Sequence, residues 1–125
     1  MLMIIISTIG GILNSFFAGY DILMKTLICF IIIDYVTGVM ISIVNHKVNS
    51  EIGYKGIFKK VLILFMVGIA VKLDIILNTK ELRYIVIMFY IINEGISIIE
   101  NTSLLGLPIP TKIKEVFERL KGGDN

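Results

Sequence analysis

The sequence has few of the residues on which catalysis, metal binding and disulfide bonding depend. It contains one cysteine, one histidine and no tryptophan among 125 residues. A single cysteine excludes an intrachain disulfide, and His46 stands in a polar stretch without the cysteines or acidic residues that would complete a metal site. The sequence also lacks GxSxG, HExxH and glycine-rich phosphate-loop motifs. These absences favour a protein that is not an enzyme and that uses no metal or cofactor.

Charged residues are also scarce. They make up 18% of the chain, hydrophobic residues make up 56%, and the mean hydropathy is +0.90. A typical soluble domain has about 25% charged and about 45–50% apolar residues. The net charge of +2 gives no reason to expect a nucleic-acid partner. Because the apolar residues gather in long blocks, the sequence predicts an all-α integral membrane protein in a single domain, residues 1–125.

Three apolar blocks predict transmembrane helices over residues 22–44, 57–77 and 84–99. The hydrocarbon core of a bilayer is about 30 Å thick and a helix rises about 1.5 Å per residue, so about 20 residues suffice to cross it. A polar connection at 45–54 and a short turn at 78–83 separate the blocks. Residues 111–121 predict an amphipathic tail helix that lies on the cytoplasmic membrane surface or pairs with its copy in a neighbour.

The N-terminal segment, residues 1–20, is apolar but interrupted by small residues. No basic region precedes it, so we do not expect a cleaved signal peptide. Drawn as a helix, its small residues form a stripe at four-residue spacing: Ser7, Gly11, Ser15 and Gly19. Such a stripe allows another helix to pack closely, or it is the mildly polar face of a helix lying in the membrane interface. The sequence leaves open whether this segment crosses the membrane.

Basic residues near the ends of the spans predict the orientation. Lys55, Lys59 and Lys60 are expected on the membrane surface, where they hold the connection against the anionic inner leaflet. The tail is basic as well. Because two spans separate these regions, both are expected in the cytoplasm. The prediction is a multi-pass protein of the bacterial cytoplasmic membrane with a cytoplasmic C-terminus.

Two acidic residues lie deep within the apolar blocks, Asp34 in the first and Glu94 in the third. A carboxylate at this depth is costly unless it meets partner groups or water. Each acid belongs to a polar helix face, and the two acids come out at comparable depth by helical count. Either the two faces pack against each other with one or both acids protonated, or they line subunit contacts or a water-filled path. We favour the second interpretation, and its candidate residues are Asp34, Thr37, Gly38, Ser42, Asn93, Glu94 and Ser97.

Lys72 and Asp74 stand near the outer end of the second block. We expect them to be interfacial anchors, because a lysine can extend its ammonium to the headgroups. The alternative is an ion pair between Lys72 and Asp34.

Short motifs in a fixed order add a further indication. They are Asp34-Tyr35-Val36-Thr37-Gly38, Gly53-Tyr54-Lys55-Gly56 followed by Lys59-Lys60, Asn93-Glu94-Gly95-Ile96-Ser97, and Pro108-Ile109-Pro110. In this order the chain resembles the bacteriophage holin family, which includes the toxin-secretion holins of clostridia, over most of residues 31–121. The resemblance implies a homo-oligomer in the lipid bilayer that opens lesions. Through them an endolysin (a cell-wall hydrolase) or a large toxin passes without a defined binding site.

Two other functions fit the same composition. One is a small dimeric proton-coupled transporter that uses a membrane-embedded acid to exchange protons for a cationic substrate. The absence of tryptophan counts mildly against a cation pocket of that kind. The other is a membrane scaffold whose tail helix recruits a partner.

Overall fold

The computed structural model describes residues 1–122, and these residues fold into helices without a strand. The all-α prediction is therefore confirmed for this part of the chain. The helices are α1 (Leu2–Phe17), α2 (Ile22–Val44), α3 (Ser50–Leu77), α4 (Glu81–Leu104) and α5 (Thr111–Gly122).

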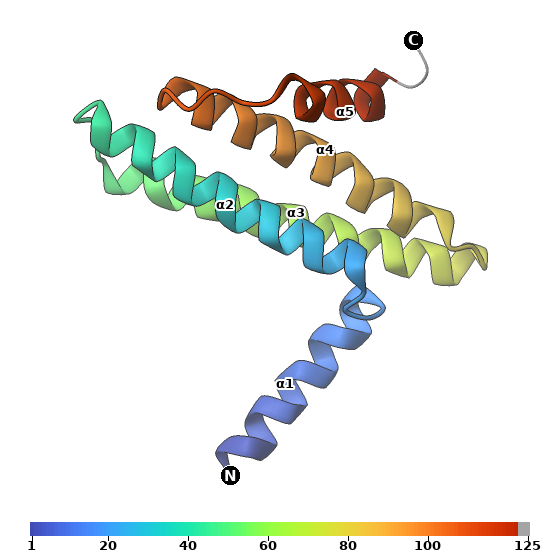
Figure 1. Cartoon of the computed structure of the whole chain (residues 1–125). Coiled ribbons are helices and arrows are strands. Elements are labelled where there is room, and N and C mark those ends of the chain that lie inside the picture. Colours follow the sequence, from blue (N-terminus) through green and yellow to red (C-terminus); the bar gives the residue numbers. More distant parts are fainter. Residues whose placement is uncertain (123–125) are drawn as a thin grey trace.

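Three helices, α2, α3 and α4, lie side by side along one axis (Figure 1). α2 and α4 run in the same direction, and α3 returns between their ends. Their facing sides bury an apolar core made of Met24, Leu27, Ile31, Ile63, Val67, Ile87 and Ile91. Burial of such side chains is the main force that holds the three helices together.

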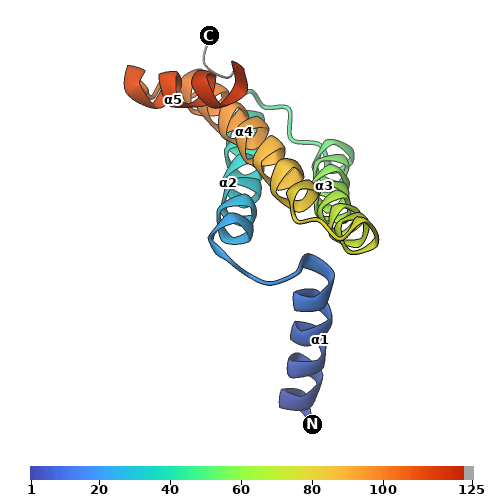
Figure 2. The ribbon, with the colours of Figure 1, turned by 90° about the vertical axis from the view of Figure 1, so that its right-hand side faces the viewer.

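α1 projects away from these three helices, and none of its residues is buried (Figure 2). Near its end it approaches α3, where the ring of Phe16 lies over Gly68. A Cβ atom at Gly68 would come within 1.9 Å of that ring, so only glycine permits this contact. α1 is therefore attached at its C-terminal end and free of the core elsewhere.

Two helices, α2 and α4, are long and apolar enough to cross a membrane. Measured by length and apolar composition, the described residues contain two candidate spans, so the prediction of three clear transmembrane helices is one too many. α3 fails because Lys59 and Lys60 precede its apolar stretch, and Lys72 and Asp74 interrupt the far end. Within residues 1–122 the remaining apolar helix, α1, is shorter, at 16 residues.

Several predicted helix ends differ from the observed ones, for local reasons. α3 begins at Ser50 instead of 57, because Asn49 accepts a hydrogen bond from the Glu51 N–H at 2.8 Å and caps the helix there. α4 is longer than the predicted 84–99 at both ends. α1 stops at Phe17 because Ala18 and Gly19 have φ angles of 58° and 106°. Gly19 is therefore outside the helix in which its small-residue stripe was predicted.

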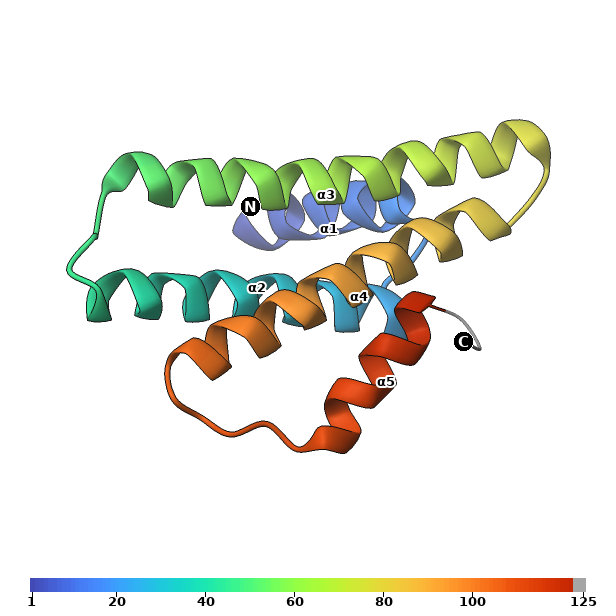
Figure 3. The same cartoon turned by 90° about the horizontal axis from the view of Figure 1, so that it is seen from above.

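α5 folds back across α4 (Figure 3). The ring of Phe117 lies over Gly95 of α4, where an added Cβ would come within 2.2 Å of it. The same ring lies 6.2 Å from that of Phe30 in α2, centroid to centroid. One aromatic side chain thus holds the amphipathic tail helix against the middle of α4.

Candidate functional site

Lys60 lies between the two acidic residues of the bundle. Its ammonium group donates hydrogen bonds to Asp34 Oδ2 and, over 2.7 Å, to Glu94 Oε2. These residues come from α3, α2 and α4, so a single side chain joins three helices. Asp34 is 7% exposed and Glu94 is 6% exposed. We call Asp34, Lys60 and Glu94 the charge cluster.

Further hydrogen bonds surround Asp34. The side-chain amide of Asn101 donates to Asp34 Oδ1 at 3.0 Å and to Thr37 Oγ1 at 2.9 Å. The Thr37 hydroxyl donates to the Ile33 carbonyl at 2.8 Å. Within residues 1–122, every buried side-chain nitrogen or oxygen has a hydrogen-bond partner. Because unpaired polar groups are costly in a low dielectric, this network specifies how α2 packs on α4.

The charge cluster contains two carboxyl groups and one ammonium group. With both acids ionised it carries one excess negative charge, and with one shared proton it is neutral. A buried net charge is expensive, and an ion pair that loses one partner is strongly destabilised. The cluster therefore depends on Lys60 more than on either acid alone.

An open cavity of about 530 Å³ lies beside the charge cluster, and we call it the polar groove. Tyr35 forms one wall, where its hydroxyl donates to the Gly53 carbonyl at 3.4 Å. The polar and small residues that line the groove are Asp34, Tyr35, Gly38, Ser42, Asn49, Ser50, Gly53, Gly56, Lys60, Ser97 and Asn101. The groove gives one of the two acids, Asp34, a route to the surface between α2, α3 and α4.

The residues predicted to line subunit contacts or a water path fall into three groups. Asp34, Thr37 and Glu94 are buried within one copy of the chain. Gly38, Ser42 and Ser97 are half-buried and line the polar groove. Asn93 is exposed and lies outside the groove. The structure thus brings six of the seven predicted residues into or beside the charge cluster and the polar groove, inside a single copy of the chain.

The sequence prediction placed Lys60 on the membrane surface, and this was wrong. Lys55 and Lys59 are exposed, and Lys55 pairs with Glu51 at 3.1 Å. Lys60 instead points inward, with 18% of its side chain exposed. It shares its helix face with the buried Ile63 and Val67. That spacing was the signal in the sequence that could have identified it.

The structure contradicts the ion pair considered for Lys72 and Asp34 and the anchor role predicted for Asp74, while the anchor role of Lys72 stays a prediction. Asp34 pairs with Lys60 and not with Lys72, which is exposed. Asp74 is buried and accepts hydrogen bonds from the Leu82 and Arg83 N–H groups at 3.0 and 2.8 Å. It therefore caps the first turn of α4 and closes the α3–α4 turn, which is a structural role.

Ser7, Gly11 and Ser15 remain on one side of α1, and all three are exposed. They line an open cavity of about 490 Å³ between α1 and α3, and Lys72 lies on its other side. The space next to the stripe is thus open within a single copy, and the helix-packing role predicted for these residues stays a prediction.

Arg83 was not singled out from the sequence, yet it fastens α1 to the bundle. Its guanidinium donates to the Phe17 carbonyl at 2.7 Å, to the Gly19 carbonyl at 3.3 Å and to both Asp21 oxygens at 3.0 Å. These hydrogen bonds hold the pKa of the Asp21 carboxyl below its usual value. We call Arg83, its two carbonyl acceptors and Asp21 the Arg83 clamp.

Comparison with known proteins gives a family and several relatives. The sequence model of the bacteriophage holin family matches residues 11–122. The chain is 43% identical over 117 residues to an uncharacterized 14.9 kDa protein in the nagH 3' region of Clostridium perfringens, covering 92% of this chain and 89% of that protein. It is 40% identical over 119 residues to an uncharacterized protein of Listeria monocytogenes, covering 92% and 85%. An uncharacterized protein of Halalkalibacterium halodurans is 34% identical over 125 residues, covering 95% and 93%. No solved structure matches the chain.

Proposed function

The chain belongs to the bacteriophage holin family, and we propose that it acts as a holin. In this proposal it accumulates in the bacterial cytoplasmic membrane, associates with its own copies and opens lesions. A cell-wall hydrolase or a large toxin then leaves the cytoplasm through the lesions.

The observation that supports the proposal is that the helix bundle encloses charged side chains while the outward sides of α2 and α3 are apolar. The outward sides of α2 and α3 expose large apolar side chains along the middle of both helices, including Ile32, Val36, Leu62, Phe65 and Ile69. The charge cluster is enclosed between the same helices. These sides of the bundle are compatible with lipid as a single copy, because the charges of the cluster are paired and the outward sides of α2 and α3 are apolar at mid-length.

We propose that α3 crosses the membrane together with α2 and α4. α2 and α4 are parallel, so the chain must return across the bilayer between them, and α3 makes that return (Figure 1). Lys60 is paired inside the bundle, which lowers its cost in lipid. Lys72 stands near the outer end, where its ammonium can reach the headgroups. With the basic α2–α3 connection inside, the C-terminus is cytoplasmic.

The polar residues supply the proposed mechanism. At low copy number Asp34 and Glu94 are neutralised within each copy by Lys60. As copies accumulate, Gly38, Ser42 and Ser97 of the polar groove are available to contact neighbouring copies. Separation of α2 from α4 in the crowded state would then hydrate the charge cluster and let its residues line a water-filled lumen.

A small proton-coupled transporter is the second candidate, and the polar groove is the observation that favours it. The groove is about 530 Å³ and reaches Asp34, which is the size and chemistry of a site for a small cation. Such a protein would pass ions without releasing macromolecules.

Induction of the gene in bacterial cells separates these functions. We expect a large cytoplasmic enzyme to appear in the medium abruptly after a delay. Proton or potassium flux without enzyme release would favour the transporter. Neither signal, with the protein present in the membrane fraction, would favour a scaffold and contradict the holin proposal.

The charge cluster links this experiment to particular residues. Asp34→Ala and Glu94→Ala each leave Lys60 with one carboxylate, so we expect normal membrane insertion and a changed time of enzyme release. Glu51→Ala, which removes an exposed acid, is the matched control. Unchanged release times in both cluster variants, at equal protein levels, would show that the cluster has no part in lesion opening.

A further inference from the structure

The exposed surface of α4 changes character along the helix. Its first half exposes the apolar Tyr84, Ile85 and Phe89, with Glu81 at its first residue. Beyond Phe89 the exposed side chains are Asn93, Glu100, Ser103 and Leu104, so three of the four are polar. The neighbouring stretch of α2 exposes Val36, Met40 and Ile43, whereas that of α3 exposes Lys55 and Lys59 besides apolar side chains. The second half of α4 is therefore less suited to lipid than its first half and than α2.

α5 adds charge to this same side at the depth of the membrane centre. Asn93 lies about 18 Å from the start of α4 and about 16 Å from its end, at about 1.5 Å per residue. Phe117 contacts Gly95, next to this midpoint. Lys114, Glu118 and Lys121 lie within about 6 Å of Phe117 along α5 by the same rise. Docked α5 thus carries its charges close to mid-membrane.

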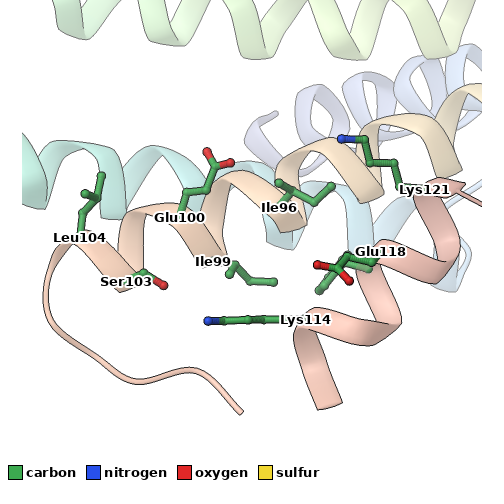
Figure 4. Close-up of a pocket in the computed structure, with 9 residues that line it drawn as sticks. Ile96, Ile99, Glu100, Ser103, Leu104, Lys114, Glu118 and Lys121 are labelled. Carbon is green, nitrogen blue, oxygen red and sulfur yellow. The ribbon is translucent and has the colours of Figure 1, made fainter. Parts of the chain in front are cut away.

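These charges line a groove of about 680 Å³ between α4 and α5, the α4–α5 groove. Figure 4 shows Lys114 extending from α5 into the space between α4 and the chain that connects the two helices. Glu100 of α4 and Glu118 of α5 also line it. Among residues 1–122, no ion pair joins these lysines to these glutamates. Glu100 lies about 6 Å from the end of α4, at about 1.5 Å per residue. The α5 charges beside Gly95 lie deeper and, among the described residues, without ion-pair partners, and such charges require water.

We propose that the α4–α5 groove faces the water-filled lumen of the assembled lesion, while the apolar sides of α2 and α3 face lipid and neighbouring copies. The proposal rests on the holin function proposed above. It makes the second half of α4 the lumen-lining element, with Glu100, Asn93 and the α5 lysines in contact with water. It also explains why α5, which is strongly charged, packs beside a helix that is apolar enough to span a membrane.

Cysteine accessibility in cells tests the assignment. Cys29 is first replaced by serine, and single cysteines are introduced as Asn93→Cys and Ile96→Cys on the proposed lumen side. Ile32→Cys, at similar depth on the exposed apolar side of α2, is the matched control. A membrane-impermeant maleimide is added before and after lesion opening, and enzyme release is recorded in the same cultures.

We expect labelling of Asn93→Cys and Ile96→Cys to rise at least fivefold when the enzyme is released, and Ile32→Cys to stay unlabelled. Enzyme release with all three cysteines equally unlabelled would overturn the lumen assignment and leave the holin function standing. In that case α5 has left α4, and lipid covers this side. Absence of enzyme release in the Cys29→Ser parent and in every variant would overturn the holin function, and the lumen assignment with it.

Discussion

At the scale of single residues, the packing of α2, α3 and α4 depends most on Lys60. It is the one cation of the charge cluster, and both of its acidic partners are buried. Either acid can be lost while the other still neutralises Lys60. Loss of Lys60 leaves two carboxyl groups facing each other without a counter-charge.

Lys60→Met therefore tests the charge cluster. Methionine keeps an unbranched side chain of similar length and removes the ammonium. Breaking a fully buried pair costs about 3–5 kcal/mol. Since the Lys60 side chain is 18% exposed, we expect the free energy of unfolding to fall by about 2–3 kcal/mol. The measurement is denaturant unfolding of the protein in detergent, followed by circular dichroism.

Lys59→Met is the matched control, because Lys59 is adjacent in sequence and exposed. We expect its unfolding free energy to change by less than about 0.5 kcal/mol. Adding Asp34→Asn and Glu94→Gln to Lys60→Met should restore part of the loss, since the unpaired charges are gone. Equal destabilisation by the two lysine variants would contradict the role assigned to Lys60.

The two acids of the charge cluster were found from the sequence, but their cation was not. An acid within a long apolar block is conspicuous whatever its surroundings, as Asp34 shows. Lys60 stands at the edge of its block beside Lys59, and lysines at such edges commonly reach the membrane surface. Only the helix face distinguishes the two lysines, because Lys60 shares its face with the buried Ile63 and Val67, whereas Lys59 is exposed.

At the scale of helices, the Arg83 clamp determines how α1 is attached. The start of α4 binds the end of α1 and the N-cap of α2 through one guanidinium. The clamp was not predicted because its acceptors include backbone carbonyls, which any residue supplies. Asp21 had two signals in the sequence, an acid directly before an apolar block and a position suited to an N-cap.

The Arg83 clamp predicts that α1 loosens in acid. The folded-state pKa of Asp21 is lowered by hydrogen bonds from Arg83. Its contribution is therefore fully present above the unfolded pKa of about 3.9 and is lost as the pH falls through the lower folded value. A spin label on Ser7→Cys, in the Cys29→Ser background, should become more mobile below about pH 3.9. Asp21→Asn should show the mobile spectrum already at pH 7.

Asp21→Asn also serves as the control for the titration of other acids. One of these is Asp74, whose carboxylate accepts a hydrogen bond from the backbone N–H of Arg83. In Asp21→Asn the remaining pH dependence of label mobility is due to those other groups. The prediction fails if the label is equally mobile in both proteins at pH 7. It also fails if the two profiles coincide in acid.

The docking of α5 depends on a close contact that only glycine permits. At Gly95 an added Cβ would lie 2.2 Å from the ring of Phe117, so Gly95→Ala should displace α5. We expect tryptic cleavage at Lys112, Lys114 and Arg119 to become several times faster in detergent. Gly38→Ala is the control, because its nearest neighbouring atom would lie at 4.0 Å. Equal cleavage rates in the two variants would mean that Gly95 does not hold α5.

At the scale of the whole molecule, the sequence predicted the all-α class and the long helices better than the relative placement of those helices. Apolar blocks reveal helices because burial in lipid or protein requires them. The placement of α1 depends on the contact of Phe16 with Gly68 and on the Arg83 clamp, and the return of α5 across α4 depends on the contact of Phe117 with Gly95. Such contacts join residues far apart in the chain and leave no periodic pattern to detect.

The side of the membrane on which α1 lies follows from the bundle as a whole. α1 has 16 residues, about 24 Å at about 1.5 Å per residue, which is short of a hydrocarbon core of about 30 Å. The Arg83 clamp fixes its end at the outer end of α4, opposite the connection that contains Lys47 and the start of α3 with Lys55. Because basic connections remain in the cytoplasm, we expect α1 to lie at the outer membrane interface.

This placement predicts an asymmetric labelling pattern in intact cells, measured before any enzyme is released. In the Cys29→Ser background, Ser7→Cys should react with a membrane-impermeant maleimide in the medium, and Lys47→Cys should react only after the cells are broken. The reverse pattern would place the α2–α3 connection outside and invert the topology. Protection of both cysteines in intact cells, with reaction of both after breakage, would place α1 on the cytoplasmic side or across the bilayer. A spanning α1 could still end beside Arg83 at the outer end of the bundle, so it would overturn only the interfacial placement, whereas α1 confined to the cytoplasmic side would also break the Arg83 clamp.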